Sequence, residues 1–204
     1  MWILITDYKY VGIKSNIFSF RILLIEKNEY LCDMRRHNGM RPQDVAILLK
    51  IILLGKEEWQ YQDLARTLHI SGAEVNASLN RSKIAGLIDF NRKRVNKLAL
   101  FEFLEHGLQY VFPIQPGAVS KGIPTAHSHP SLKNKIISET LFVWPDIGGT
   151  EIGQSIEPLF NNQVQAAKED PLLYEILSLI EILRVGKNRE KNIALSHLKK
   201  IIEH

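Results

Sequence analysis

The sequence has little that would support a secreted, membrane-bound or disulfide-linked protein. Its single cysteine, Cys32, excludes an intramolecular disulfide and favours a reducing compartment. Charged residues interrupt every apolar run before it reaches the roughly 18 residues that a membrane-spanning helix needs. The opening residues lack the cationic start and the small-residue cleavage site of a signal peptide. We therefore expect a cytoplasmic protein with no membrane partner.

Motifs for catalysis and cofactor binding are also scarce. The glycine-containing stretch 148–153 follows neither the phosphate-loop pattern nor the dinucleotide-binding pattern. His127 and His129 form a His-x-His pair in a proline-flanked loop, but a zinc site needs three or four ligands, and the spacing of the other candidate ligands does not supply them. We therefore expect no enzyme, no cofactor and no metal, and we expect this loop to pack on the preceding domain.

The composition that is present is that of a globular protein. The chain has 204 residues, of which 45% are hydrophobic and 24% charged, and it can bury a core without disulfides or metal. Its net charge of +4 and isoelectric point of about 9.1 are compatible with a nucleic-acid partner. The apolar periodicity predicts a mostly α fold with a small β-wing and a C-terminal helical region.

Four segments differ in pattern, and we predict domains from them: 1–39, 40–112, 113–170 and 171–204. Half of residues 1–32 are Ile, Lys, Asn, Tyr or Phe, which have AT-rich codons. Residues 1–39 are therefore either a poorly patterned N-terminal arm or translated intergenic sequence, with the true start at Met34 or Met40. Residues 113–170 are rich in proline and glycine and are predicted to form a linker with a short hairpin.

Segment 40–112 carries the clearest pattern of helices. Residues 45–54 are apolar on nearly all sides, which predicts a helix buried within the domain or across a dimer interface. Two shorter helices are expected at 61–68 and 72–85, with Ser71 capping the second one and Glu74 at capping-box spacing. A charged hairpin follows at 87–95, and a further helix is expected at 97–110.

The motif of this segment runs from Leu64 to Ile88. It reads L-A-x-x-L-x-I-S from Leu64, then V-x-x-x-L from Val75, then A-G-L-I up to Ile88. Over residues 42–97 the chain resembles the winged helix-turn-helix of bacterial transcription regulators, especially the MarR-like group. It departs from that pattern at His69, where the family usually has Gly, and at Ser82, where an apolar residue usually packs.

The resemblance implies a double-stranded DNA partner, with the helix at 72–85 in the major groove and the hairpin on the flanking backbone or minor groove. Asn76 and Asn80 would pair with adenine edges, and Arg81 with guanine or phosphate. The expected DNA-binding residues are Ser71, Ala73, Asn76, Ala77, Asn80, Arg81, Arg92, Lys93 and Arg94. Residues 81–97 contain six basic side chains and one acidic one, so their net charge of +5 exceeds that of the whole chain.

Segment 171–204 predicts two amphipathic helices, at 171–185 and 188–202, that need a surface to cover their apolar stripes. Together with the apolar 45–54 helix, these stripes predict a homodimer, and they are also a possible site for a protein partner.

The sequence favours a DNA-binding transcription regulator, a repressor or autoregulator. Two alternatives stay open: an antitoxin of a toxin–antitoxin pair, and a winged-helix protein-interaction module without DNA binding.

Overall fold

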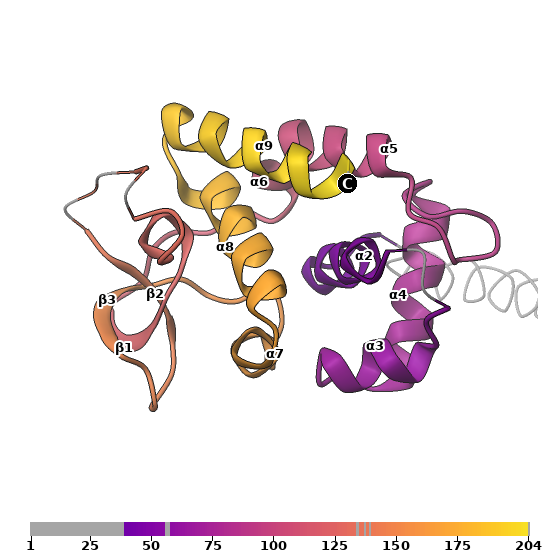
Figure 1. The fold of residues 1–204 in the computed structure, drawn as a ribbon, viewed down its shortest axis with the longest axis horizontal. Helices are drawn as coiled ribbons and strands as arrows, with labels where there is room; N and C mark the ends of the chain where they lie inside the picture. The colour runs from indigo at the N-terminus through magenta and orange to yellow at the C-terminus, as the bar shows by residue number, and fades with distance from the viewer. Residues whose placement is uncertain (1–38, 56–57, 134, 137, 139, 204) are drawn as a thin grey trace, which may run out of the picture. The chain divides into compact units, whose positions relative to one another are not determined.

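The structure is a computed structural model that describes residues 39–55, 58–133, 135–136, 138 and 140–203. Residues Gly39–His204 form one compact unit. The prediction of an N-terminal arm or a false start concerns residues 1–39, of which 1–38 lie outside the described residues. Most of the described elements are helices, and a small three-stranded sheet accompanies them (Figure 1).

Helix α2 (Pro42–Leu54) is the centre of the N-terminal part. Pro42 occupies its first turn, and the Arg41 backbone N–H donates to the carboxylate of Asp44 at 2.8 Å, which satisfies one N–H at the helix start. Residues 45–49 are completely buried because α3, α4 and α8 surround the helix. The prediction that this run is buried on several sides is confirmed, and the burial occurs within one chain.

Helices α3 (Tyr61–Thr67) and α4 (Gly72–Ile84) pack against each other and on α2. The Ser71 hydroxyl accepts a hydrogen bond from the Glu74 backbone N–H at 3.1 Å, so the predicted cap is confirmed. Gly86 ends this part of the chain with a φ of 73°, in the left-handed region that favours glycine.

A short hairpin over residues 88–95, the 88–95 hairpin, connects α4 to the next helix. Its only β-bridge within the described residues joins Ile88 to Val95. Asn96 then caps α5 (Lys97–Glu102), which continues as a π-helical turn (Phe103–Gly107) and as α6 (Leu108–Val111). The predicted helix over 97–110 is therefore present, with one wider turn in its middle.

The segment 113–170, predicted as a linker with a short hairpin, contains the whole three-stranded sheet. Strands β1 (Val119–Pro124), β2 (Phe142–Pro145) and β3 (Glu151–Ser155) form a closed arrangement in which each strand pairs with both others. Strand β1 is antiparallel to β2 and β3, with Ile123 opposite Trp144, and β2 is parallel to β3. A three-residue 3-10 turn (Ala126–Ser128) follows β1, and helix α7 (Gln163–Glu169) follows β3.

The two predicted C-terminal helices are confirmed as α8 (Pro171–Val185) and α9 (Asn188–Glu203). Most of helix α8 is buried, because it contacts α2, α6, α7 and α9 (Figure 1). Helix α9 lies on α8 and α5 with Ala194, Leu198 and Ile202 buried. These stripes, like that of α2, are covered within one chain, so the reason for expecting a second chain is removed.

None of the helices within the described residues combines the length and the apolar character that crossing a bilayer requires.

Candidate nucleic-acid interface

Helix α4 has one buried side and one exposed side. Val75, Ser78 and Leu79 face the core, and the 3.6-residue period therefore turns the positions between them outward. The expected DNA-facing residues on the outer side are exposed, except for Ala77, which is half-buried: Ser71, Ala73, Asn76, Ala77 and Asn80. The exposed side therefore carries small side chains and two amides, and lets another surface approach closely.

Arg81 does not belong to this exposed side, and the expectation that it reaches guanine or phosphate is corrected. Its side chain is 9% exposed and donates to both carboxylate oxygens of Asp44, at 2.8 and 2.6 Å. It also donates to Glu74 at 2.5 Å. The hydrogen bonds to Asp44, outweighing desolvation, raise the pKa of Arg81 further. Arg81 therefore ties α4 to the start of α2.

Glu74 takes part in the same network rather than in a reciprocal capping box. Its carboxylate accepts from Arg81 and from the Gln43 amide at 2.7 Å, and it lies 3.6 Å from Arg41. Burial alone would raise the pKa of Glu74, but the hydrogen bonds from Arg81 and Gln43 outweigh it and lower the pKa. The Glu74 carboxylate is therefore occupied by these contacts within the protein and is not free to accept a hydrogen bond from a DNA base.

Arg92 joins the 88–95 hairpin to α4. Its Nη1 donates to Asn76 Oδ1 at 2.8 Å and to Asn80 Oδ1 at 2.9 Å. Its guanidinium carbon lies 5.6 Å from the ring centroid of Tyr61, at the start of α3. The predicted basic tip therefore folds against the predicted reading helix, so α3, α4 and the hairpin form one surface.

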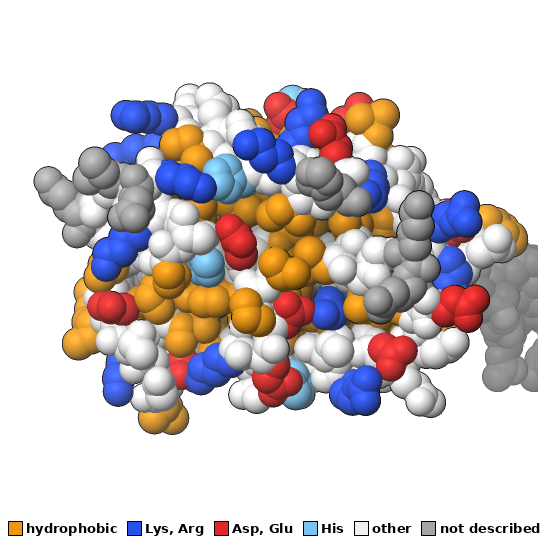
Figure 2. Space-filling model, viewed as in Figure 1, with side chains coloured by type: hydrophobic (Ala, Val, Ile, Leu, Met, Phe, Trp, Pro, Cys, Tyr) orange, Lys and Arg blue, Asp and Glu red, His pale blue; other side chains and the backbone are white. Residues whose placement is uncertain are grey.

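The other two basic residues of the hairpin differ in what they contact. The Lys93 ammonium donates to the Trp59 carbonyl at 2.9 Å and lies 4.2 Å from the centroid of the Trp59 ring. Arg94 is exposed. The Asp89 carboxylate accepts from the backbone N–H groups of both residues, at 2.7 and 2.9 Å, and so fixes the turn. Figure 2 shows Lys and Arg side chains over this hairpin.

The positive charge continues from the hairpin to the start of α5. Lys93, Arg94 and Lys97 line one side of a cleft between the hairpin and the end of α2. Ile51 and Val95 are among its apolar lining residues. Glu58 also lines the cleft, so cations outnumber acids there by three to one, and a cation of this kind can neutralise a phosphate.

Sequence reasoning missed Phe90 at the hairpin tip. Its side chain is 80% exposed, and the Lys83 ammonium lies 3.5 Å from its ring centroid. The sequence pattern placed Phe90 in the strand before the charged tip, whereas it lies in the turn itself. The pair places a cation and an aromatic ring at the end of α4.

Sequence reasoning also missed a contact between α7 and the turn before α4. His69 has a φ of 52°, the left-handed region, at the position where the resembled family usually has Gly. Its carbonyl accepts from Asn162 at 2.5 Å, and its Nε2 lies 2.9 Å from a carboxylate oxygen of Glu169. These partners lie about a hundred residues away in sequence, so no local pattern predicts them.

The His127–His129 loop is buried beside β2 and α8. The His127 ring bonds the Thr140 carbonyl at 2.7 Å and packs at a tilt against Phe142, and His129 packs edge-on against Tyr174. Burial lowers the pKa of His129. No cluster of three or more His, Cys, Asp or Glu that could hold a metal ion occurs within the described part of the chain.

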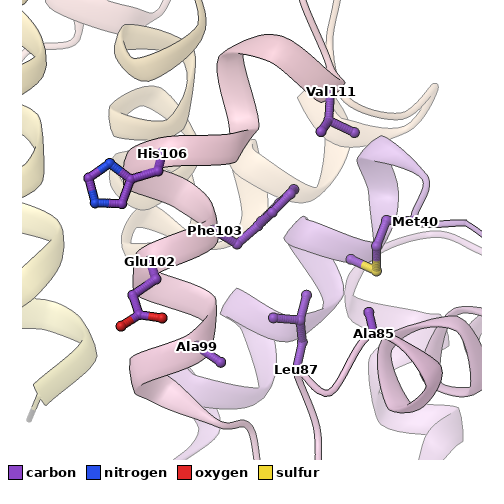
Figure 3. Close-up of a pocket in the computed structure, with 8 residues that line it drawn as sticks. All are labelled: Met40, Ala85, Leu87, Ala99, Glu102, Phe103, His106 and Val111. Atoms are coloured by element: carbon purple, nitrogen blue, oxygen red, sulfur yellow. The ribbon is translucent and has the colours of Figure 1, made fainter.

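A further groove lies along the π-helical turn (Figure 3). Phe103 points from that turn to the side on which Met40 and Val111 lie, while Glu102 and His106 project from the other side of the helix. Val111 closes one end of the groove. The lining of the groove is mostly apolar, although Glu102 and His106 also border it.

Comparisons of the chain with known protein families, with curated proteins and with solved structures find no match. The resemblance to winged helix-turn-helix regulators therefore rests on the pattern between Leu64 and Ile88.

Proposed function

We propose that the protein binds double-stranded DNA through a winged helix-turn-helix and acts as a transcription regulator. In this proposal α3 and α4 are the helix-turn-helix, α4 enters the major groove, and the 88–95 hairpin is the wing. The observation that carries the proposal is the Arg92 contact with Asn76 and Asn80, because it joins the basic hairpin to the amides of α4 in one exposed surface.

In this proposal the side chains of α4 and those of the hairpin have different roles in DNA binding. Amides on the exposed side of α4 can reach base edges, which carry sequence information. Lys93, Arg94 and Lys97 can contact phosphates, which supply affinity without reading sequence. Small residues at the start of α4, Gly72 and Ala73, allow the helix to approach the groove floor.

The core geometry supports a rigid presentation of this surface. The Arg81–Asp44 pair fixes α4 on α2, and Asn162 and Glu169 hold the turn between α3 and α4. A recognition helix needs such support, because loose positioning of the reading groups lowers specificity.

A homodimer remains part of the proposal on general grounds, since paired reading helices would contact two half-sites about one helical turn apart. Light scattering of the full chain tests it. A monomer that binds its site with full affinity would contradict the dimer and leave the DNA proposal intact.

The experiment for the proposed function compares wild-type protein with an Asn76→Ala/Asn80→Ala variant on the DNA upstream of its own gene. The proposal predicts preferential binding to this DNA over a scrambled duplex, and loss of that preference in the variant. A protein-interaction module without a DNA role would bind neither duplex.

A further inference from the structure

The two amides of α4 are held in one orientation by Arg92. Nη1 of a guanidinium carries two hydrogens, and here one is donated to each of Asn76 Oδ1 and Asn80 Oδ1, at 2.8 and 2.9 Å. In a planar carboxamide the carbonyl oxygen and the amino group diverge from the same carbon. Both carbonyl oxygens bind Arg92, so each Nδ2 group points in another direction and stays available as a donor.

Arg92 itself is held firmly enough to impose this orientation. Its φ is 58°, a conformation that costs a non-glycine residue about 1 kcal/mol or more. It is stacked near Tyr61 at 5.6 Å, and the Arg92 N–H donates to the Asp89 carbonyl at 2.9 Å. Contacts with α3, α4 and the hairpin thus fix its position before any partner arrives.

Arg92 occupies one lone pair of each Oδ1 and turns both oxygens toward itself, so the groups best placed to meet a partner at this point are N–H donors. An asparagine reads adenine by accepting from N6 and donating to N7, and this needs Oδ1 turned toward the base rather than toward Arg92. Guanine presents two acceptors in the major groove, O6 and N7. The free Nδ2 groups and the remaining N–H groups of Arg92 match that edge, and the positive charge of Arg92 favours it.

We propose that the Arg92–Asn76–Asn80 cluster selects guanine, and that the amides do not read adenine as the sequence pattern suggested. This inference rests on the proposed DNA-binding function. Because Asn76 and Asn80 lie one helical turn apart, the cluster reads guanines at neighbouring base pairs. Arg92 acts as a specificity-determining residue through the amides that it orients as well as through its own N–H groups.

The test is selection from a library of duplexes with a randomised centre, using full-length wild type, Arg92→Ala and Arg94→Ala. Both variants lose one positive charge, but only Arg92→Ala frees the amides to turn. Wild type and Arg94→Ala are expected to enrich guanine at the same neighbouring positions. Arg92→Ala is expected to admit adenine there. Arg92→Gly, which accepts the left-handed backbone without strain, serves if the alanine variant does not fold.

A second arm separates base reading from phosphate contact. The selected duplex is made with 7-deazaguanine at the enriched positions, which removes the N7 acceptor and leaves every phosphate in place. Wild-type affinity is expected to fall by about tenfold, the size of one good base contact. Unchanged affinity would mean that the donors contact phosphates, and would overturn the inference.

Other results of the library selection would also overturn the inference. Enrichment of adenine by wild type, or the same shift in base preference for Arg92→Ala and Arg94→Ala, would overturn the inference while DNA binding stands. Failure of wild type to retain any duplex from the library would overturn the inference and the proposed function together.

Discussion

The guanidinium of Arg81 is bound to the carboxylate of Asp44 by two hydrogen bonds, one from Nε and one from Nη2, at 2.8 and 2.6 Å. Asp44 is completely buried, and Arg81 is 8% exposed. The pair joins the first turn of α2 to the last turns of α4. Arg81, which the sequence pattern assigned to DNA contact, therefore holds α4 in place on α2.

Replacing Arg81 is therefore expected to destabilise the protein rather than to weaken DNA contacts directly. Arg81→Ala leaves the buried Asp44 carboxylate without its cation, which costs about 3–5 kcal/mol in the free energy of unfolding. Urea denaturation measures this. Asn80→Ala, on the exposed side of the same helix, is the control and should change stability by less than about 0.5 kcal/mol. An Arg81→Ala protein as stable as wild type would contradict the assignment.

Asn76 and Asn80 are expected to determine the preference for one DNA sequence and to contribute little to the stability of the protein. Asn76→Ala and Asn80→Ala should each reduce the ratio of affinities for the preferred and the scrambled duplex by about tenfold. Their melting temperatures should stay near that of wild type, because both positions are exposed. Fluorescence anisotropy on both duplexes checks this, and an unchanged ratio in the double variant would count against base reading by α4.

Arg94 is expected to contribute through phosphate. Arg94→Ala should weaken binding to both duplexes by the same factor and reduce the slope of log affinity against log salt by about 1. The matched control is Arg189→Ala, which removes an exposed cation at the start of α9. A loss confined to the preferred duplex would instead assign Arg94 to base reading.

Several elements were predictable because their signals are local. The capped starts at Ser71 and Asn96 and the apolar stripes of α8 and α9 depend on residues only a few positions apart. Strand β1 was not, because it is a polar and glycine-containing segment whose pairing depends on β2 and β3. The sheet forms from contacts that no window of sequence contains.

In the candidate site, too, some features follow from local sequence and others depend on contacts with distant residues. Exposure of Asn76 and Asn80 follows from helical periodicity, but the position of Arg92 depends on the fold of the hairpin. The role of Arg81 had a partial signal, since it stands two helical turns after Glu74 and three residues after the buried Ser78. Its main partner, Asp44, lies 37 residues away and has no sequence signal.

The Lys50–Asp170 pair predicts a dependence of stability on acid pH. Their atoms Nζ and Oδ2 lie 2.7 Å apart, and Asp170 also accepts from the backbone of Leu172 and Leu173. Burial alone would raise the pKa of Asp170, but these hydrogen bonds outweigh it and hold the pKa below 3.8. The stabilisation is therefore complete above pH 3.8 and is lost as the pH falls through the lower folded pKa.

Asp170→Asn should accordingly lower the free energy of unfolding by about 1.5–3 kcal/mol at neutral pH, the range for hydrogen bonds to charged groups. The difference from wild type should shrink below pH 3.8, where the wild-type carboxylate begins to protonate. Thermal melts across this range measure it. Glu203→Gln, in an exposed pair with Lys199, should show no such dependence.

The packing of the sheet predicts a strict requirement for glycine at position 122. A Cβ there would lie 2.1 Å from the carbonyl oxygen of Trp144, so the strands would have to separate. Gly122→Ala should destabilise the protein by at least about 1–3 kcal/mol. Gly72→Ala is the control, because its Cβ would meet nothing within 4 Å. Equal melting temperatures for the two variants would contradict the described pairing of β1 with β2.

The most direct test of the central claim is the binding of the full chain to the DNA upstream of its own gene, compared with a scrambled duplex of the same composition, by fluorescence anisotropy at two salt concentrations. A DNA-reading surface made of α4 and the 88–95 hairpin predicts preference for the native sequence and steep weakening with salt. Equal, weak and salt-insensitive binding to both duplexes would contradict it.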